Sequence, residues 1–132
     1  MTRVFVLEDD PQRIVAFQDA ALAAGVDLTL AKDAFSAMTA FDGPYDCLFL
    51  DHDLGGEVHV PSDAPNTGAA FCRHLMRSTA RDRVIVHSYN QAGAMEMIRT
   101  LREKGYSAVW SPFGPSVLAH LASLGGAEET QG

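Results

Sequence analysis

The chain has few cysteines, fewer basic than acidic residues, and no long apolar run. Its two cysteines, Cys47 and Cys72, lie in an apolar run and a helical pattern without C-x-x-C spacing, which favours reduced core residues over a disulfide. With 10 basic and 17 acidic residues, the net charge of −7 argues against a broad nucleic-acid-binding surface. No run approaches the roughly 18 apolar residues of a membrane span, and the opening residues do not resemble a secretion signal. We therefore expect a cytoplasmic protein that does not bind membranes.

The length and composition predict one folded domain. The chain has 132 residues, of which 47% are hydrophobic and 20% are charged, an ordinary balance for a globular protein. The last residues, GGAEETQG, have no apolar periodicity. We expect a domain over residues 1–124 and a flexible tail over residues 125–132.

Five short apolar runs alternate with five helical patterns along the chain. The runs that we predict to be strands are Val4–Leu7, Leu28–Leu30, Leu48–Leu50, Val84–Val86 and Ala108–Trp110. Helices are expected from Pro11, after Asp33, over Thr67–Ser78, over Gln91–Lys104, and from after Phe113 to about Leu124. This alternation predicts a flavodoxin-like, doubly wound parallel sheet of strand order 2-1-3-4-5 in a three-layer α/β/α sandwich. The side chains expected in its core include Leu22, Phe35 and Met76.

Acidic residues follow the first and third predicted strands. Glu8-Asp9-Asp10 ends the first, and Asp51-His52-Asp53 ends the third. In an open parallel sheet, ligands bind at the carboxyl ends of the strands. Several carboxylates at one place repel one another unless they are protonated or bridged by a cation. We therefore predict a Mg²⁺ or Mn²⁺ site held by Asp9 and Asp51 with Asp53 or Glu8; Asp10 is better explained as a helix cap.

Two histidines also follow predicted strands. His52 and His87 each come directly after an apolar run, and imidazole titrates near neutrality. One such histidine would more often be a hydrogen-bonded structural residue, but two beside an acidic cluster favour proton transfer. His59 is a weaker candidate, and His74 and His120 are expected on helix surfaces.

Residues 54–66 form the longest irregular connection inside the chain. A loop of this length favours a lid or a binding loop, although a tolerated surface insertion is the alternative.

The chain resembles the receiver domains of two-component response regulators over residues 3–124. Asp9-Asp10 is similar to the acidic pair of that family, Asp51 to its phospho-accepting aspartate, and Ser88 to its hydroxyl residue. Ser111-Pro112-Phe113 stands where receivers have Lys-Pro-Phe. Because Ser111 replaces the lysine that contacts the phosphoryl group, this position argues against a phosphate-driven switch.

A narrower resemblance is to the cyclic-phosphate processing receiver domains. The segments that carry it are Leu50-Asp51-His52-Asp53-Leu54-Gly55, Asn66-Thr67-Gly68 and His87-Ser88-Tyr89-Asn90, with Gly93 and Met97 behind them. This resemblance implies an enzyme that acts on a cyclic phosphate, either a cyclic nucleotide or the 2′,3′-cyclic phosphate end of an RNA.

We therefore predict a metal-dependent phosphoesterase. Asp51 would act at the cation, and His87 and His52 would exchange a proton with the attacking water or the leaving alcohol. Ser88 and Asn90 would donate hydrogen bonds to phosphoryl oxygens. The alternative function is a response-regulator-type receiver, phospho-accepting or degenerate, that acts as a signalling module and binds a partner protein; either function allows a homodimer.

Overall fold

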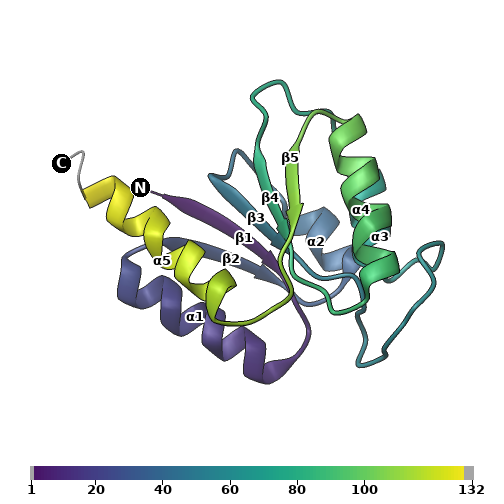
Figure 1. The fold of residues 1–132 in the computed structure, drawn as a ribbon, viewed down its shortest axis with the longest axis horizontal. Helices are drawn as coiled ribbons and strands as arrows, with labels where there is room; N and C mark the ends of the chain where they lie inside the picture. Colours follow the sequence, from purple (N-terminus) through teal and green to yellow (C-terminus); the bar gives the residue numbers. More distant parts are fainter. Residues whose placement is uncertain (1, 130–132) are drawn as a thin grey trace.

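The five strands form one parallel sheet. The structure is a computed structural model that describes residues 2–129. Its strands are β1 (Arg3–Leu7), β2 (Asp27–Ala31), β3 (Cys47–Leu50), β4 (Arg83–Val86) and β5 (Ser107–Trp110). They pair in the order β2-β1-β3-β4-β5, as predicted, and every pairing is parallel (Figure 1). The carboxyl ends of β1, β3 and β4 are consequently neighbours at one edge of the sheet.

Helices cover both faces of the sheet. They are α1 (Pro11–Ala24), α2 (Ala34–Ala40), α3 (Gly68–His74), α4 (Gln91–Glu103) and α5 (Pro115–Glu129). Figure 1 shows α1 and α5 on one face and α2, α3 and α4 on the other. Side-chain oxygens of Asp10, Asp33, Thr67 and Asn90 accept hydrogen bonds from first-turn N–H groups of the helices that they precede. The predicted capping role of Asp10 is thereby confirmed.

Each face of the sheet has its own hydrophobic core. Phe5 belongs to the core under α2, α3 and α4, where it packs on Phe71, whereas Phe49 packs on Phe17 under α1 and α5. All four residues of β3 are buried, as expected for a central strand. The two cysteines are free and buried in these cores, as predicted.

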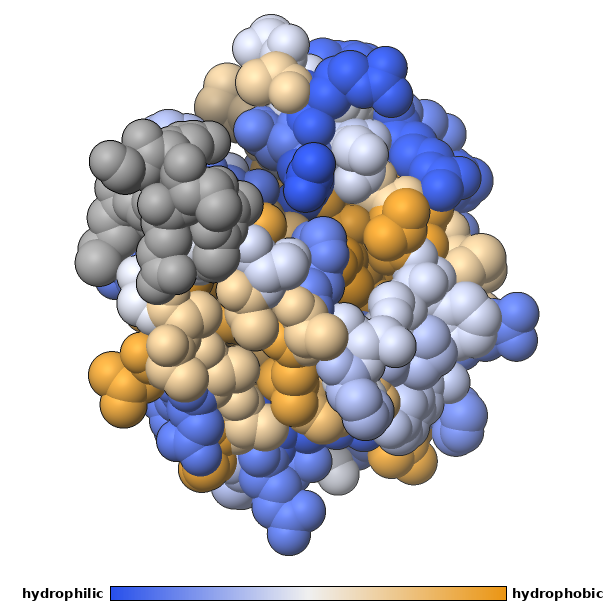
Figure 2. All heavy atoms as spheres, turned by 60° about the vertical axis from the view of Figure 1, so that its left-hand side comes forward, coloured by the Kyte–Doolittle hydropathy of each residue, from blue (hydrophilic) through white to orange (hydrophobic). Residues whose placement is uncertain are grey.

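Three side chains expected in the core are exposed instead: Leu22 by 83%, Phe35 by 79% and Met76 by 85%. Leu22 and Phe35 each follow the residue that their helix buries, Ala21 and Ala34, and so point about 100° away from the core. Met76 lies beyond the end of α3, so helical spacing does not apply to it. Figure 2 turns the side of α1 and α5 forward and shows apolar residues at the surface among hydrophilic ones.

The last helix is longer than expected. It continues to Glu129 and so includes residues 125–129 of the expected flexible tail; residues 130–132 lie outside the described part. Gly125 is buried, and a Cβ atom at this position would lie 2.2 Å from the carbonyl oxygen of Ala24. Gly125 therefore allows α5 to approach the end of α1 closely and does not terminate the helix. Among residues 2–129, no helix is both long enough and apolar enough to cross a membrane.

Candidate active site

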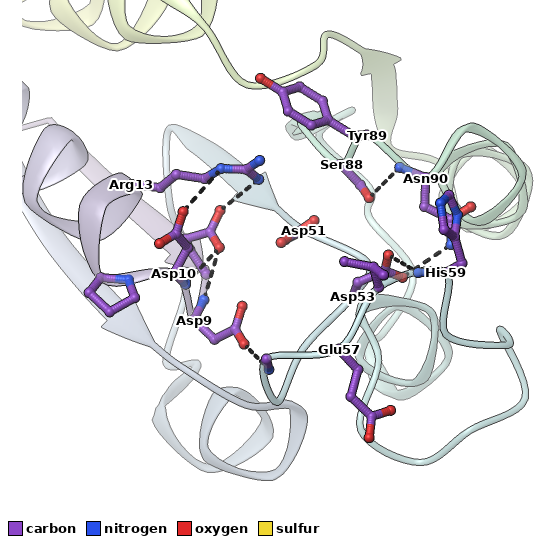
Figure 3. Close-up of a pocket in the computed structure, with 14 residues that line it drawn as sticks. Asp9, Asp10, Arg13, Asp51, Asp53, Glu57, His59, Ser88, Tyr89 and Asn90 are labelled. Atoms are coloured by element: carbon purple, nitrogen blue, oxygen red, sulfur yellow. Dashed lines mark hydrogen bonds and ion pairs between the residues drawn. The ribbon is translucent and has the colours of Figure 1, made fainter.

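A cavity of about 560 Å³ opens at the carboxyl ends of β1, β3 and β4. Its lining comes from three strand ends, the first turn of α1 and the irregular loop: Glu8, Asp9, Asp10, Pro11, Arg13, Asp51, Asp53, Gly56, Glu57, Val58, His59, Ser88, Tyr89 and Asn90. Figure 3 shows Asp51 between Asp10 and Arg13 on one side and Ser88 and Asn90 on the other. All the acidic residues predicted to hold a metal, Asp9, Asp51, Asp53 and Glu8, thus border one cavity.

Asp51 lies at the inner end of this cavity and is only 5% exposed. Its Oδ1 accepts a hydrogen bond of 2.8 Å from the backbone N–H of His52. Burial, followed by the charge of Glu8, raises the pKa of Asp51 to about 8. At neutral pH and without a cation, Asp51 is therefore mostly protonated.

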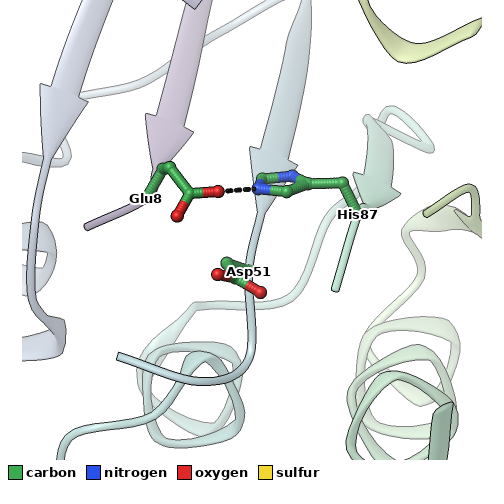
Figure 4. A group of neighbouring side chains, drawn as sticks. All are labelled: Glu8, Asp51 and His87. Atoms are coloured by element: carbon green, nitrogen blue, oxygen red, sulfur yellow. Dashed lines mark hydrogen bonds and ion pairs between the residues drawn. The ribbon is translucent and has the colours of Figure 1, made fainter. Parts of the chain in front are cut away.

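Glu8 and His87 form a fully buried pair beside Asp51 (Figure 4). His87 Nε2 lies 2.9 Å from Glu8 Oε1. Burial opposes ionisation of Glu8, but the hydrogen bond and charge of His87, the N–H of Asp10 and the charge of Arg13 together lower its pKa. Burial also lowers the pKa of His87, although Glu8 opposes this shift. The pair is therefore best described as a carboxylate that accepts a hydrogen bond from a neutral imidazole.

The neutral His87 leaves one ring nitrogen without a partner. Because Nε2 donates to Glu8, Nδ1 carries the lone pair, and it makes no hydrogen bond within the described residues. Oxygen or nitrogen atoms of Glu8, Asp51 and His87 lie within 4.8 Å of one another. This buried cluster therefore combines an ionised carboxylate, a protonated one and an imidazole that can take up a proton.

Asp9 faces the irregular loop. Its Oδ2 accepts a hydrogen bond of 2.7 Å from the N–H of Gly56, which has a φ of 76°. The Asp9 carboxylate thus reaches the cavity from β1 and fixes the loop on the opposite side.

His52 and Asp53 form a second histidine–carboxylate pair. His52 Nδ1 lies 2.7 Å from Asp53 Oδ1, and His52 Nε2 lies 2.9 Å from Ser62 Oγ. Asp53 also accepts hydrogen bonds from the N–H groups of His59 and Val60. Burial opposes the ionisation of Asp53, but these bonds lower its pKa overall. Asp53 therefore holds the middle of the irregular loop, at His59 and Val60, against the end of β3.

The two predicted proton-transfer histidines do not line the cavity. The rings of His52 and His87 are both 0% exposed, so each reaches the cavity only through a carboxylate. Ser88 and Asn90 do line it: Ser88 Oγ accepts the N–H of Asn90, and Asn90 Nδ2 donates to Asp53. The catalytic roles of these residues remain predictions.

Two further site residues escaped sequence analysis. Arg13 lines the cavity and forms ion pairs with two acidic residues, with Nη1 3.7 Å from Glu8 Oε1 and Nε 3.5 Å from Asp10 Oδ2. Its guanidinium group also stacks over the ring of Tyr89. Its place one turn into α1, three residues after the cap, could have suggested that it faces the acidic cluster. Ser62 contacts His52 across an irregular loop, and no periodic signal could have revealed it.

The remaining histidines differ in position. His59 lines the cavity, and His74 is exposed as predicted. The expectation for His120 was wrong because this residue is partly buried, with its ring 6.2 Å from that of Phe49. Ser111, in the position of the receiver lysine, is not among the residues that line the cavity.

Comparison with known proteins identifies both a family and a fold. Residues 5–103 match the family model described as the cyclic-phosphate processing receiver domain. No curated protein matches the chain.

Solved receiver domains share the fold at low sequence identity. The non-phosphorylated HemR receiver domain of Leptospira biflexa is 17% identical, with a TM-score of 0.69 and coverage of 95% of this chain and 94% of that one. The CheY-like receiver protein of Methanospirillum hungatei is 14% identical, with a TM-score of 0.65 and coverage of 100% and 99%. TrrA of Thermotoga maritima, solved with Mg²⁺ and BeF, is 16% identical, with a TM-score of 0.65 and coverage of 94% and 99%.

Proposed function

This chain belongs to the cyclic-phosphate processing receiver domain family, and we propose that it is a metal-dependent phosphoesterase that opens a cyclic phosphodiester. The observation that carries this proposal is the buried Asp51 beside Glu8, at the inner end of a cavity of about 560 Å³. The substrate would be a cyclic nucleotide or the 2′,3′-cyclic phosphate end of an RNA. A cavity of this volume is within the usual range for small-molecule sites.

The chemistry of the donor groups fits a divalent cation. Asp51 retains a proton because its burial, and then the nearby charge of Glu8, make a second carboxylate unfavourable, and a cation would replace that proton. Oxygen ligands from Asp51, Glu8 and Asp9 suit Mg²⁺ or Mn²⁺. The Mg²⁺ in the TrrA complex supports this choice. Asp53 is less suited, because its oxygens already accept hydrogen bonds from His52, His59, Val60 and Asn90.

The other residues around the cavity would bind and orient the phosphate. A bound cation would polarise a phosphoryl oxygen and lower the pKa of an attacking water. Asn90 would donate a hydrogen bond to the phosphate, and so would Ser88. Arg13, the one arginine or lysine among the lining residues, would add positive charge at the rim.

Proton transfer would run through the buried pair. The water loses a proton as its oxygen bonds to phosphorus, and the leaving alkoxide gains a proton as the ring P–O bond breaks. His87 would hold the transferred proton on Nδ1, because Nε2 already carries the proton that it donates to Glu8, and the resulting imidazolium would form an ion pair with that carboxylate. His52 would keep Asp53 and the loop in place.

The direct test is ³¹P NMR of cyclic phosphates incubated with the protein. We expect 2′,3′-cyclic or 3′,5′-cyclic nucleotides to become phosphomonoesters with Mg²⁺ or Mn²⁺, and to remain intact with EDTA. Asp51→Asn should reduce turnover to background, whereas Asp19→Asn, the same substitution on the exposed side of α1, should not.

The alternative, signalling receiver predicts the opposite outcome. In that case no cyclic phosphate would be opened, and acetyl phosphate would give a stable phosphoryl group on Asp51 together with dimerisation. That result would overturn the enzyme proposal.

A further inference from the structure

A second cavity, of about 430 Å³, lies beside the first and shares His59 and Asn90 with it. The irregular loop supplies one wall, and the start of α4 supplies the other. Its lining residues are His59, Val60, Pro61, Ser62, Asn90, Ala92, Gly93 and Glu96. Ser62 is partly exposed and is the one hydroxyl residue in this lining.

Ser62, His52 and Asp53 are arranged as a serine nucleophile, a base and an orienting carboxylate. Ser62 Oγ lies 2.9 Å from His52 Nε2, and His52 Nδ1 lies 2.7 Å from Asp53 Oδ1. Both distances are within the reach that nucleophile–base–carboxylate systems require. The ring is fully buried, so the serine is the member of the group that faces the cavity directly.

The surroundings of the imidazole fix its tautomer. Asp53 Oδ1 already accepts hydrogen bonds from the N–H of Val60 and from Asn90 Nδ2, so it acts as an acceptor and His52 Nδ1 carries the proton of the 2.7 Å contact. In this tautomer, Nε2 has its lone pair directed at Ser62 Oγ–H. This is the tautomer that a general base toward serine needs.

Packing holds the ring in place, and a hydrogen bond holds the backbone of the serine. A Cβ atom on Gly93 would lie 2.6 Å from ring carbons of His52, so α4 presses directly on the imidazole. The carbonyl oxygen of Ser62 accepts a hydrogen bond of 2.9 Å from Arg73 Nη1. Base and nucleophile are therefore both positioned before any ligand binds.

The charges around this cavity favour a neutral electrophile. None of its lining residues is a lysine or arginine, and Glu96, the one acidic residue there, is paired with Arg99. A phosphate anion would meet little positive charge, whereas an uncharged ester would not be repelled. Ala92, in the first turn of α4, also lines the cavity, and N–H groups in a first helical turn lack intrahelical partners and can stabilise a developing oxyanion.

We propose that Ser62, His52 and Asp53 form a second catalytic site, which hydrolyses small neutral carboxylic esters. Ser62 Oγ bonds to the ester carbonyl carbon while its proton passes to His52 Nε2; the bond from that carbon to the alcohol oxygen breaks, and the alcohol takes the proton. Water then attacks the acyl-serine and gives a proton to His52. Ser62 recovers its proton from His52 as the carboxylic acid leaves.

The test uses a fluorophosphonate probe and p-nitrophenyl acetate on the full chain. The probe forms a bond from Ser62 Oγ to phosphorus and loses fluoride, so we expect mass spectrometry to locate the adduct on Ser62. Ser62→Ala should abolish the adduct and reduce ester hydrolysis at least about 100-fold, the lower range for loss of a positioned catalytic group. Ser116→Ala, which removes another exposed serine hydroxyl, should do neither.

A second variant separates activation from mere exposure of the serine. His52→Gln keeps Ser62 but removes the base, and it should also abolish labelling while the protein retains a cooperative unfolding transition. The proposal is overturned if wild type is not labelled, if the adduct lies on another serine, or if ester hydrolysis persists in Ser62→Ala. Labelling of a folded His52→Gln protein at the wild-type rate would equally overturn it.

Discussion

The same chemical pair, a histidine and a carboxylate, occurs twice at the edge of the sheet in two different environments. Glu8 and His87 are both 0% exposed and lie behind Asp51. In the other pair the ring of His52 is fully buried, but the Asp53 side chain is 13% exposed and its oxygens bind loop N–H groups. The first pair sets the charge at the inner end of the cavity, and the second holds a loop and contacts Ser62.

This difference shows that burial and the remaining hydrogen-bond partners decide what such a pair does. Burial, followed by the Glu8 charge, raises the pKa of Asp51, so the first pair contributes to the control of when a cation can bind. The charge of Asp53 is instead stabilised by hydrogen bonds from the N–H of His59 in the loop and from Asn90, which caps α4. Substitutions in or beside the Glu8–His87 pair should therefore affect cation binding. Substitutions in the His52–Asp53 pair should affect the loop.

The largest difference is expected between Asp51→Asn and Asp53→Asn. Both replace a carboxyl group by an amide of the same shape, which cannot become a carboxylate ligand. Mn²⁺ should raise the unfolding midpoint of wild type, with a stabilisation of about 2.7 kcal/mol at 100 times the dissociation constant. Asp51→Asn should lose this response, and Asp53→Asn should keep it. Thermal unfolding with and without Mn²⁺ checks this, and equal responses in the two variants would contradict the separation of the pairs.

His87 variants separate charge from hydrogen bonding. His87→Ala leaves Glu8 buried without its partner and should cost about 3–5 kcal/mol of stability. His87→Gln can still donate to Glu8 but cannot take up a proton. It should remain folded while cyclic-phosphate hydrolysis falls by roughly 10²–10⁴-fold. Turnover in a ³¹P assay is the measurement, and full activity in His87→Gln would exclude His87 from proton transfer.

The pH dependence of stability should show the raised pKa of Asp51. Native Asp51 holds a proton up to about pH 8, whereas the unfolded chain releases it near its ordinary value of 3.8, so stability falls as pH rises through that range. The lowered pKa values of His87 and His120, both caused mainly by burial, act in the opposite sense, but mostly below their ordinary value of 6.5. Between pH 6.5 and 8 the Asp51 effect therefore dominates.

Urea unfolding in EDTA should then lose on the order of 1 kcal/mol across that window in wild type. Asp51→Asn should give a flat profile, and so should wild type saturated with Mn²⁺. A wild-type profile that is flat in EDTA would mean that Asp51 is already ionised.

The smallest effect is expected in the loop. Asp53→Asn weakens the hydrogen bonds that hold the N–H groups of His59 and Val60. A loss of about 1.4 kcal/mol in the free energy of local opening of the loop corresponds to a tenfold increase in the equilibrium constant for that opening. Hydrogen exchange of residues 54–66 should accelerate by about that factor, while exchange in β3 should not change. Unchanged exchange in the loop would show that Asp53 does not hold it.

The sheet and the caps followed from the sequence because they depend on local signals. Alternation of apolar runs and helical spacing placed all five strands, and Asp10 before Pro11 marked the start of α1. The neighbouring strand ends could also be inferred, so the acidic residues were expected at one cavity.

The partners within the site did not follow, because they depend on side-chain direction. Glu8 and His87 are 79 residues apart, and His52 meets Ser62 across an irregular loop. Gly125 resembled a helix end, yet a glycine is also what allows two helices to approach closely. Tertiary packing decided between these two roles.

The most direct test of the cation site is the number of protons released when Mn²⁺ binds. Calorimetric titrations at pH 7 in buffers of different ionisation enthalpy measure this number. Because the pKa of Asp51 is about 8, wild type should release about 0.9 proton per ion at pH 7 and about 0.1 at pH 9. Asp51→Asn should bind no ion. Binding by wild type without proton release at pH 7, or undiminished binding by Asp51→Asn, would contradict the placement of the cation at Asp51.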